Sequence, residues 1–250
     1  MVRCSSVNFD NTILNNLRNV LDSSPNKELS GALKLSFNKK QNCFSVGVGK
    51  IQKGTAEEAT LVETMHNFHT HPRDAYIAHN TNIGWPSESD FKTFMYCFFR
   101  YKNIMHCVCG LEGIYVITIH PDSFDYLMNK PSLQETKQRR IDTLIEKIYI
   151  DKDIPLYKRP SFDGVPITTP EQYVDFVNKT EMLKNKPLFK LTFIQWDNPD
   201  KIVVCNPWIE SDKPKERKKS GKKKSGKKKS GKKKSKKNIR TGERTVFFIN

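Results

Sequence analysis

The fold is decided by two neighbouring stretches of sequence, TLVETMHNFHTHP at residues 60–72 and WPSESDFKTFMYCFFRY at residues 85–101. The first predicts a strand over 60–71. The strand ends before Pro72, because proline cannot donate to a strand ladder. The second opens with Pro and Ser and repeats apolar residues at helical spacing, which predicts a helix over 87–101. A strand that leads into a helix indicates that both kinds of element are mixed along the chain.

The flanking sequence adds further elements of both kinds. The expected helices cover residues 10–21, 132–148 and 170–183. The expected strands cover residues 28–37, 43–51, 103–109, 113–119, 188–196 and 201–205, with a strand-like end at 245–249. This order predicts an α/β (α+β) fold in which helices flank a mixed, mostly antiparallel sheet.

The excess positive charge lies in one segment near the C-terminus. Residues 213–240 hold 17 of the 43 basic residues and one of the 27 acidic residues, which accounts for the net charge of +16. Within this segment, SGKKKSGKKKSGKKKS at 220–235 has no apolar residue and predicts a disordered region. We therefore expect a first domain over 1–130, helices and strands packing on it over 131–211, a disordered basic repeat over 212–240 and a terminal strand-like segment over 241–250.

The six cysteines are scattered through mostly apolar sequence without a CxxC pair, which indicates buried free thiols in a reducing compartment. The N-terminus lacks a charged region followed by an apolar region, and no stretch approaches the roughly 18 apolar residues of a membrane span. We expect a soluble, intracellular protein without a membrane partner. It would act in the cytoplasm or the nucleus, or in the host cell or virion if the gene is viral.

Two histidines at the end of the 60–71 strand are candidate metal ligands. Side chains alternate along a strand, so His69 and His71 point to the same face and can share one zinc ion. Ser87 and Asp90 are three residues apart and share one face of the first helical turn. Two histidines and a carboxylate leave a fourth position on zinc for water, whose pKa the metal lowers to about 7. The pattern predicts a hydrolytic Zn²⁺ site on His69, His71 and Asp90.

Each candidate also has a structural interpretation. The histidines can be metal-free packing residues, Asp90 can be a carboxylate that stabilises the helix N-terminus, and Ser87 can be a plain N-cap. Glu28, at the start of the 28–37 strand, is the candidate general base, whereas a glutamate at a strand end is more often solvated. His106 is interpreted as a packing or surface residue.

Together these residues resemble the signature of the JAB/MPN (JAMM) zinc metalloproteases. An E-x-x-G-x-L stretch begins at Glu28, H-T-H-P occupies 69–72, and W-x-S-x-x-D occupies 85–90. The resemblance covers residues 28–90, and the order of elements is similar to that fold out to about residue 119. It implies that the expected domain over 1–130 is an MPN-like catalytic domain.

The resemblance also implies a role for each residue. In the family, the two histidines and the aspartate bind zinc, the glutamate is the general base, and the serine stabilises the tetrahedral oxyanion. Here those positions are His69, His71, Asp90, Glu28 and Ser87. Active members mostly remove ubiquitin or ubiquitin-like modifiers from lysines, which predicts a zinc-dependent isopeptidase with a ubiquitin-like protein as substrate.

Three alternatives remain open at this point. The enzyme can be a peptidase that acts on other proteins, or the chain can be a catalytically silent MPN scaffold. It can also be a polyanion- or nucleic-acid-binding protein anchored by residues 213–240, with binding that is sequence-independent and sensitive to salt. The same basic segment can be a solvated linker or a nuclear-import signal. The spacer between His71 and Ser87 is longer than is usual in the family and contains His79, interpreted as an exposed loop residue.

Overall fold

Strands and helices alternate along the chain as the sequence indicates. The main strands are β1 (Arg3–Phe9), β2 (Leu29–Asn38), β3 (Cys43–Lys53), β4 (His66–Thr70), β5 (Met105–Cys109), β6 (Gly113–Ile119), β9 (Phe189–Gln195) and β10 (Asp200–Asn206). The helices are α1 (Asn11–Asp22), α2 (Arg73–Ala78), α3 (Glu88–Tyr101), α4 (Phe124–Met128), α5 (Gln134–Ile150) and α6 (Pro170–Lys179). Short elements complete the set: the 3-10 turns η1 (Pro121–Ser123) and η2 (Pro131–Leu133), and the strands β7 (Ser161–Phe162) and β8 (Val165–Pro166).

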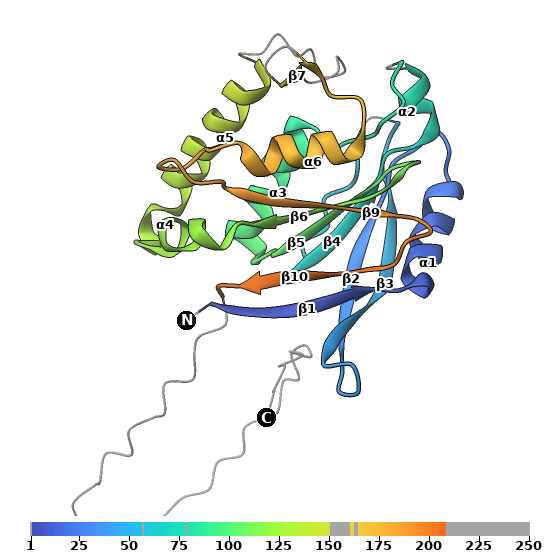
Figure 1. Ribbon diagram of the computed structural model, residues 1–250, viewed down its shortest axis with the longest axis horizontal. Helices are drawn as coiled ribbons and strands as arrows, with labels where there is room; N and C mark the ends of the chain where they lie inside the picture. Colours follow the sequence, from blue (N-terminus) through green and yellow to red (C-terminus); the bar gives the residue numbers. More distant parts are fainter. Residues whose placement is uncertain (1, 57, 79, 151–160, 163–164, 209–250) are drawn as a thin grey trace, which may run out of the picture. The chain divides into compact units, whose positions relative to one another are not determined.

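These elements are seen in a computed structural model that describes residues 2–56, 58–78, 80–150, 161–162 and 165–208. The described residues belong to one unit, Met1–Ser211. Eight strands form one sheet with the order β10-β1-β3-β2-β4-β5-β6-β9 (Figure 1). Within it, β1 and β3 pair in parallel, as do β4 and β5, and the other pairs are antiparallel. The expected mixed, mostly antiparallel sheet flanked by helices is confirmed.

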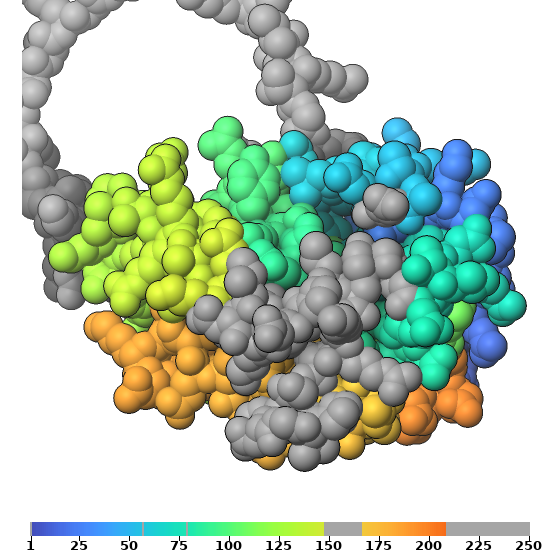
Figure 2. All heavy atoms as spheres, turned by 90° about the horizontal axis from the view of Figure 1, so that it is seen from above, coloured from blue at the N-terminus to red at the C-terminus, as the bar shows by residue number. Residues whose placement is uncertain are grey.

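Each face of the sheet carries its own apolar core. Because side chains alternate along a strand, Ile114 and Val116 of β6 face the core under α1, while Tyr115 and Ile117 face the core under α3, α4, α5 and α6. Helix α5, yellow-green in Figure 2, lies beside the green α3 on the second face. None of the helices in the described ranges is long and apolar enough to cross a bilayer.

Strand β4 has a different side chain for each core. Phe68 is 1% exposed and belongs to the core under α1, whereas His69 points to the side of α3. Across the ladder, Phe68 faces Gly31 of β2, where a side-chain carbon would lie 2.6 Å from the Phe68 ring. Glycine at this position therefore makes room for the ring, and the ring fixes the face to which both histidines of the motif point.

Strand β4 is shorter than expected, because it begins at His66 and not at residue 60. In residues 60–65, side chains and not a neighbouring strand donate to two backbone carbonyls. Ser30 Oγ donates to the Thr60 carbonyl, and Asn67 Nδ2 donates to the Val62 carbonyl. The strand prediction was therefore wrong for residues 60–65. The predicted 245–249 strand and the basic repeat of residues 212–240 lie outside the described residues.

Several elements and one covalent bond were missed in the sequence. Strand β1 pairs with β10 and places Cys4 directly opposite Cys205, where the two form a disulfide. The expectation that all six cysteines are free thiols was wrong for this pair, because β1 had not been recognised. The other four cysteines are free and buried, as expected. Helix α2 was also missed, and it lies in the long spacer between His71 and Ser87; α4 and the short strands β7 and β8 were not expected either.

The position of Phe68 leads to a test of the fold. Replacement of Phe68 by Ala should lower the free energy of unfolding by about 3–5 kcal/mol, because a buried aromatic ring leaves a cavity. Replacement of Phe37 by Ala in the neighbouring strand β2 is the control, since Phe37 is 40% exposed, and should cost about 1 kcal/mol or less. Urea denaturation measures both. Equal losses for the two variants would contradict the assigned core.

Candidate metal centre

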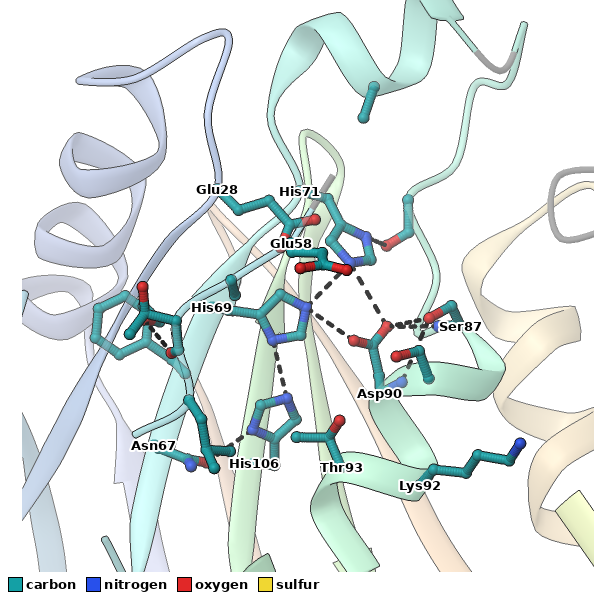
Figure 3. Close-up of a pocket in the computed structure, with 18 of the residues that line it drawn as sticks. Glu28, Glu58, Asn67, His69, His71, Ser87, Asp90, Lys92, Thr93 and His106 are labelled. Atoms are coloured by element: carbon teal, nitrogen blue, oxygen red, sulfur yellow. Dashed lines mark hydrogen bonds and ion pairs between the residues drawn. The ribbon is translucent and has the colours of Figure 1, made fainter. Parts of the chain in front are cut away.

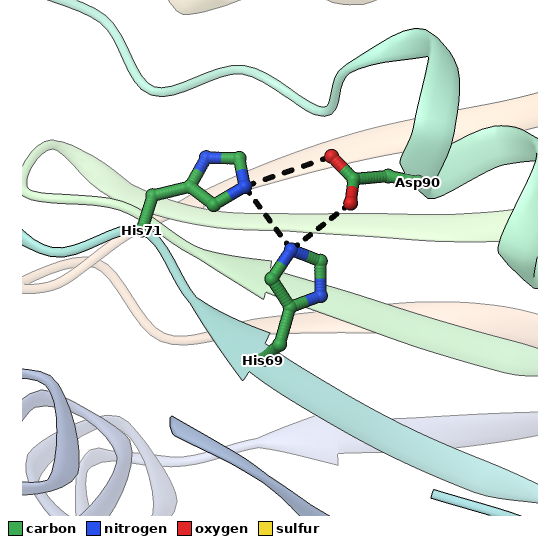
Figure 4. A group of neighbouring side chains, drawn as sticks. All are labelled: His69, His71 and Asp90. Atoms are coloured by element: carbon green, nitrogen blue, oxygen red, sulfur yellow. Dashed lines mark hydrogen bonds and ion pairs between the residues drawn. The ribbon is translucent and has the colours of Figure 1, made fainter. Parts of the chain in front are cut away.

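His69 and His71 meet at the end of β4, on the side of the sheet that faces α3. The amide of His71 donates to the Cys109 carbonyl at 2.9 Å, which continues the pairing with β5 by one residue beyond the strand. Both side chains therefore keep the alternation of the strand and point the same way. Their Nε2 atoms lie 3.0 Å apart (Figure 4).

Asp90 reaches the histidines from the first turn of α3. Ser87 is the N-cap of this helix, and its hydroxyl oxygen accepts from the Asp90 amide, while Asp90 Oδ2 accepts from the Ser87 amide at 2.6 Å. This reciprocal capping box fixes the Asp90 rotamer. Asp90 Oδ1 lies 3.1 Å from His69 Nε2, and Oδ2 lies 3.6 Å from His71 Nε2. The capping role and the ligand role are thus compatible.

The spacing of these atoms fits a single metal ion. The ligand atoms of His69, His71 and Asp90 all lie within 4.8 Å of one another. Ligands at about 2.0–2.1 Å from a tetrahedral ion are about 3.3 Å apart, which is close to the observed separations. Where all three present lone pairs, they repel one another unless a cation lies between them.

Protonation shows the same demand for positive charge. Burial alone would lower the pKa of His71, but its hydrogen bond to Asp90 and the nearby carboxylates raise that pKa to about 9. Burial alone would raise the pKa of Asp90, and the two histidines instead hold it well below the usual range. A cation, either a proton or a metal ion, is therefore strongly favoured among the three side chains.

Glu28 lies beside this cluster, just before β2. Its amide donates to the Thr55 carbonyl and its carbonyl accepts from Gly54, so the backbone is held by the loop after β3. The side chain is 9% exposed, and burial raises its pKa, while His69 and His71 act in the opposite direction. Its carboxylate points toward the ring of His71 (Figure 3). Glu28 is thus a buried carboxylate beside the candidate ligands, not a solvated strand-end residue.

All five residues singled out in the sequence line one cavity of about 590 Å³. They are Glu28, His69, His71, Ser87 and Asp90. The Ser87 hydroxyl donates to Asp90 Oδ2 at 2.9 Å. Leu61 and Tyr96, which are 39% and 45% exposed, also line this cavity. His79 lies outside the described residues.

His106 is a neighbour of the cluster whose contacts the sequence did not predict. Asn67 Nδ2 donates to the Val62 carbonyl, so Asn67 Oδ1 faces His106 Nδ1 at 2.7 Å and accepts a hydrogen bond from that nitrogen. His106 Nε2 is then free to accept from His69 Nδ1 at 2.9 Å. Burial, together with His69, lowers the pKa of His106 to about 3, so its ring is neutral. This chain of contacts leaves the Nε2 lone pair of His69 directed at the cluster.

The signal for this contact lay in strand pairing and not in composition. Asn67 lies two residues before His69 on β4, so strand alternation puts both side chains on one face, and both line the cavity. His106 is its register partner in the parallel pair β4–β5. Such a pairing joins residues that are 39 positions apart. Parallel strands are joined by a long crossover and not by a hairpin turn, so no local turn motif predicts their register.

Comparison of the sequence with protein-family models and with curated proteins finds no match. What the geometry establishes is a group of two histidines and one aspartate that is able to bind a metal ion, beside a buried glutamate and a serine.

Removal of one ligand should abolish metal binding. The wild-type protein is expected to bind about one divalent ion per chain, and His71→Ala and Asp90→Ala are expected to bind none, because two remaining donors hold zinc weakly. Elemental analysis after dialysis measures the content. His120→Ala is the control, since His120 caps η1 away from this cavity. A full complement of metal in both ligand variants would refute the ligand set.

Proposed function

We propose that the protein is a zinc metalloprotease of the JAB/MPN (JAMM) type that hydrolyses isopeptide or peptide bonds. The observation that carries this proposal is the convergence of His69, His71 and Asp90 beside the buried carboxylate of Glu28 in one cavity. Two imidazoles and one carboxylate with an open fourth position form a ligand set that is typical of catalytic zinc. A mostly antiparallel sheet with helices on both faces is compatible with an MPN-like fold.

The chain's own residues supply the remaining parts of a hydrolytic site. A zinc ion in this position supplies Lewis acidity toward a carbonyl and makes water more acidic. Glu28, buried beside the ligands, takes a proton from the attacking water and passes it to the leaving amine. Ser87, at the N-terminus of α3, donates its hydroxyl hydrogen to the developing oxyanion once it leaves Asp90.

The proposed substrate is a conjugate of ubiquitin or of a ubiquitin-like protein. A cavity of about 590 Å³, lined in part by the exposed side chains of Leu61 and Tyr96, is compatible with a peptide substrate. The cavity does not discriminate between an isopeptide and an ordinary peptide bond, so the runner-up is a peptidase that acts on other proteins. The third candidate is a catalytically inactive MPN scaffold. An inactive scaffold does not account for the convergence of His69, His71 and Asp90.

A second, independent role is proposed for residues 213–240. Their 17 basic residues and single acidic residue favour contact with nucleic acid or another polyanion, which would be sequence-independent and weaken as salt is raised. The segment has no aromatic residue that could stack on bases. Such a segment is also compatible with action in the nucleus, although a linker of this composition would serve in the cytoplasm as well.

Replacement of Glu28 by Gln tests the proposed mechanism. The variant should keep its zinc, because Glu28 is not among the ligands, but should lose turnover by about 100-fold or more, since general base catalysis contributes about 10²–10⁴-fold. Activity is measured on a panel of ubiquitin and ubiquitin-like conjugates, and zinc by elemental analysis of the same sample. Turnover at the wild-type level in Glu28→Gln would show that the base is misassigned.

A further inference from the structure

The long spacer between His71 and Ser87 is anchored to the domain at several points. Helix α2 begins it, and the amide of Asp74 donates to the Pro25 carbonyl. Tyr76 and Ile83 are 6% and 7% exposed. The spacer is therefore packed against the domain through buried side chains in both its first and its second half.

The strongest anchor is Glu112, in the turn between β5 and β6. Its Oε2 accepts from the Tyr76 hydroxyl at 2.6 Å, and its Oε1 accepts from the Gly84 amide and from the Tyr115 hydroxyl, both at 2.8 Å. The Tyr76 oxygen in turn accepts from the Leu111 amide at 2.7 Å. Hydrogen bonds to a carboxylate are stronger than those between neutral groups, so this network fixes the spacer firmly to the β5–β6 turn.

The same residue that Glu112 holds, Gly84, also contacts a candidate metal ligand. The Gly84 amide donates to Glu112, and the Gly84 carbonyl lies 2.9 Å from His71 Nδ1. A carbonyl only accepts, so Nδ1 of His71 carries a hydrogen there and Nε2 is the nitrogen presented to the cluster. A side-chain carbon on residue 84 would lie 2.1 Å from the Tyr76 oxygen, so only glycine fits in this arrangement.

We propose that the spacer is a positioning element, in which Glu112 and Tyr76 hold the Gly84 carbonyl so that His71 presents Nε2 to the metal. This inference rests on the proposed metal site and concerns a part of it that the motif residues do not include. His69 receives the equivalent support from His106, so each histidine ligand is held by a different part of the fold. Partners in the second coordination sphere of this kind contribute about 10–100-fold to metal affinity.

The test compares zinc affinities of the full-length protein by competition with a chromophoric chelator. Glu112→Ala removes the carboxylate that accepts these hydrogen bonds, and Tyr76→Phe removes one hydroxyl that donates to it. Glu112→Ala should weaken zinc binding by about 10–100-fold. Glu112→Gln should restore most of the affinity, because its carbonyl oxygen still accepts from Gly84. Tyr101→Phe is the matched control, since the Tyr101 hydroxyl also donates to a carboxylate, that of Glu63, but outside the cavity; its affinity should equal that of the wild type.

A second readout separates positioning from general stability. The visible spectrum of the Co²⁺-substituted protein reports the coordination of the metal. It should change in Glu112→Ala and not in Tyr101→Phe. The melting temperatures of both apo proteins are measured separately to compare their stability. Tyr76→Phe keeps the experiment decisive if Glu112→Ala fails to fold. Wild-type affinity and an unchanged Co²⁺ spectrum in folded Glu112→Ala and Tyr76→Phe would overturn the inference.

The outcomes also distinguish this inference from the proposed function. Weakened zinc binding in Glu112→Ala, with no cleavage of any conjugate by the wild type, would support the positioning role and count against the peptidase. Cleavage by the wild type, with unaltered zinc affinity in folded Glu112→Ala, would do the reverse. A wild-type protein that binds no zinc would overturn both.

Discussion

The structure depends on the convergence of three electron-pair donors at the end of β4. His69 Nε2, His71 Nε2 and the Asp90 carboxylate lie 3.0–3.6 Å from one another. Such a group is stable in a buried site only if a cation compensates it. Each of the surrounding features serves this arrangement: the alternation of β4 aims both rings, and the capping box of α3 places the carboxylate between them.

The support of the two rings shows how the fold directs this convergence. The contacts at both Nδ1 atoms leave both Nε2 atoms to the cluster: His106 on β5 holds His69, and the Gly84 carbonyl in the spacer holds His71. Glu112 connects that spacer to the β5–β6 turn. The candidate ligands are therefore held by segments that lie far apart in the sequence, as in a site that a rigid scaffold forms in advance.

Local sequence patterns were sufficient to predict most of the strands and helices and the motif residues. The helical spacing of 87–101 and the alternation of His69 and His71 are properties of a few adjacent residues, so they could be read directly. Strand β1 was missed, and with it the Cys4–Cys205 bond, because its partners β3 and β10 are distant in sequence. The roles of His106 and Glu112 were missed for the same reason: each depends on a tertiary contact and not on a local period.

The account is tested most directly by X-ray diffraction from crystals grown with zinc, with data collected on both sides of the zinc absorption edge. One anomalous peak is predicted at about 2.0–2.2 Å from His69 Nε2, from His71 Nε2 and from an Asp90 oxygen, with Glu28 nearby but not coordinated. A peak at another place, or none between these three side chains in a well-ordered crystal, would contradict the metal centre and the zinc-dependent hydrolase built on it.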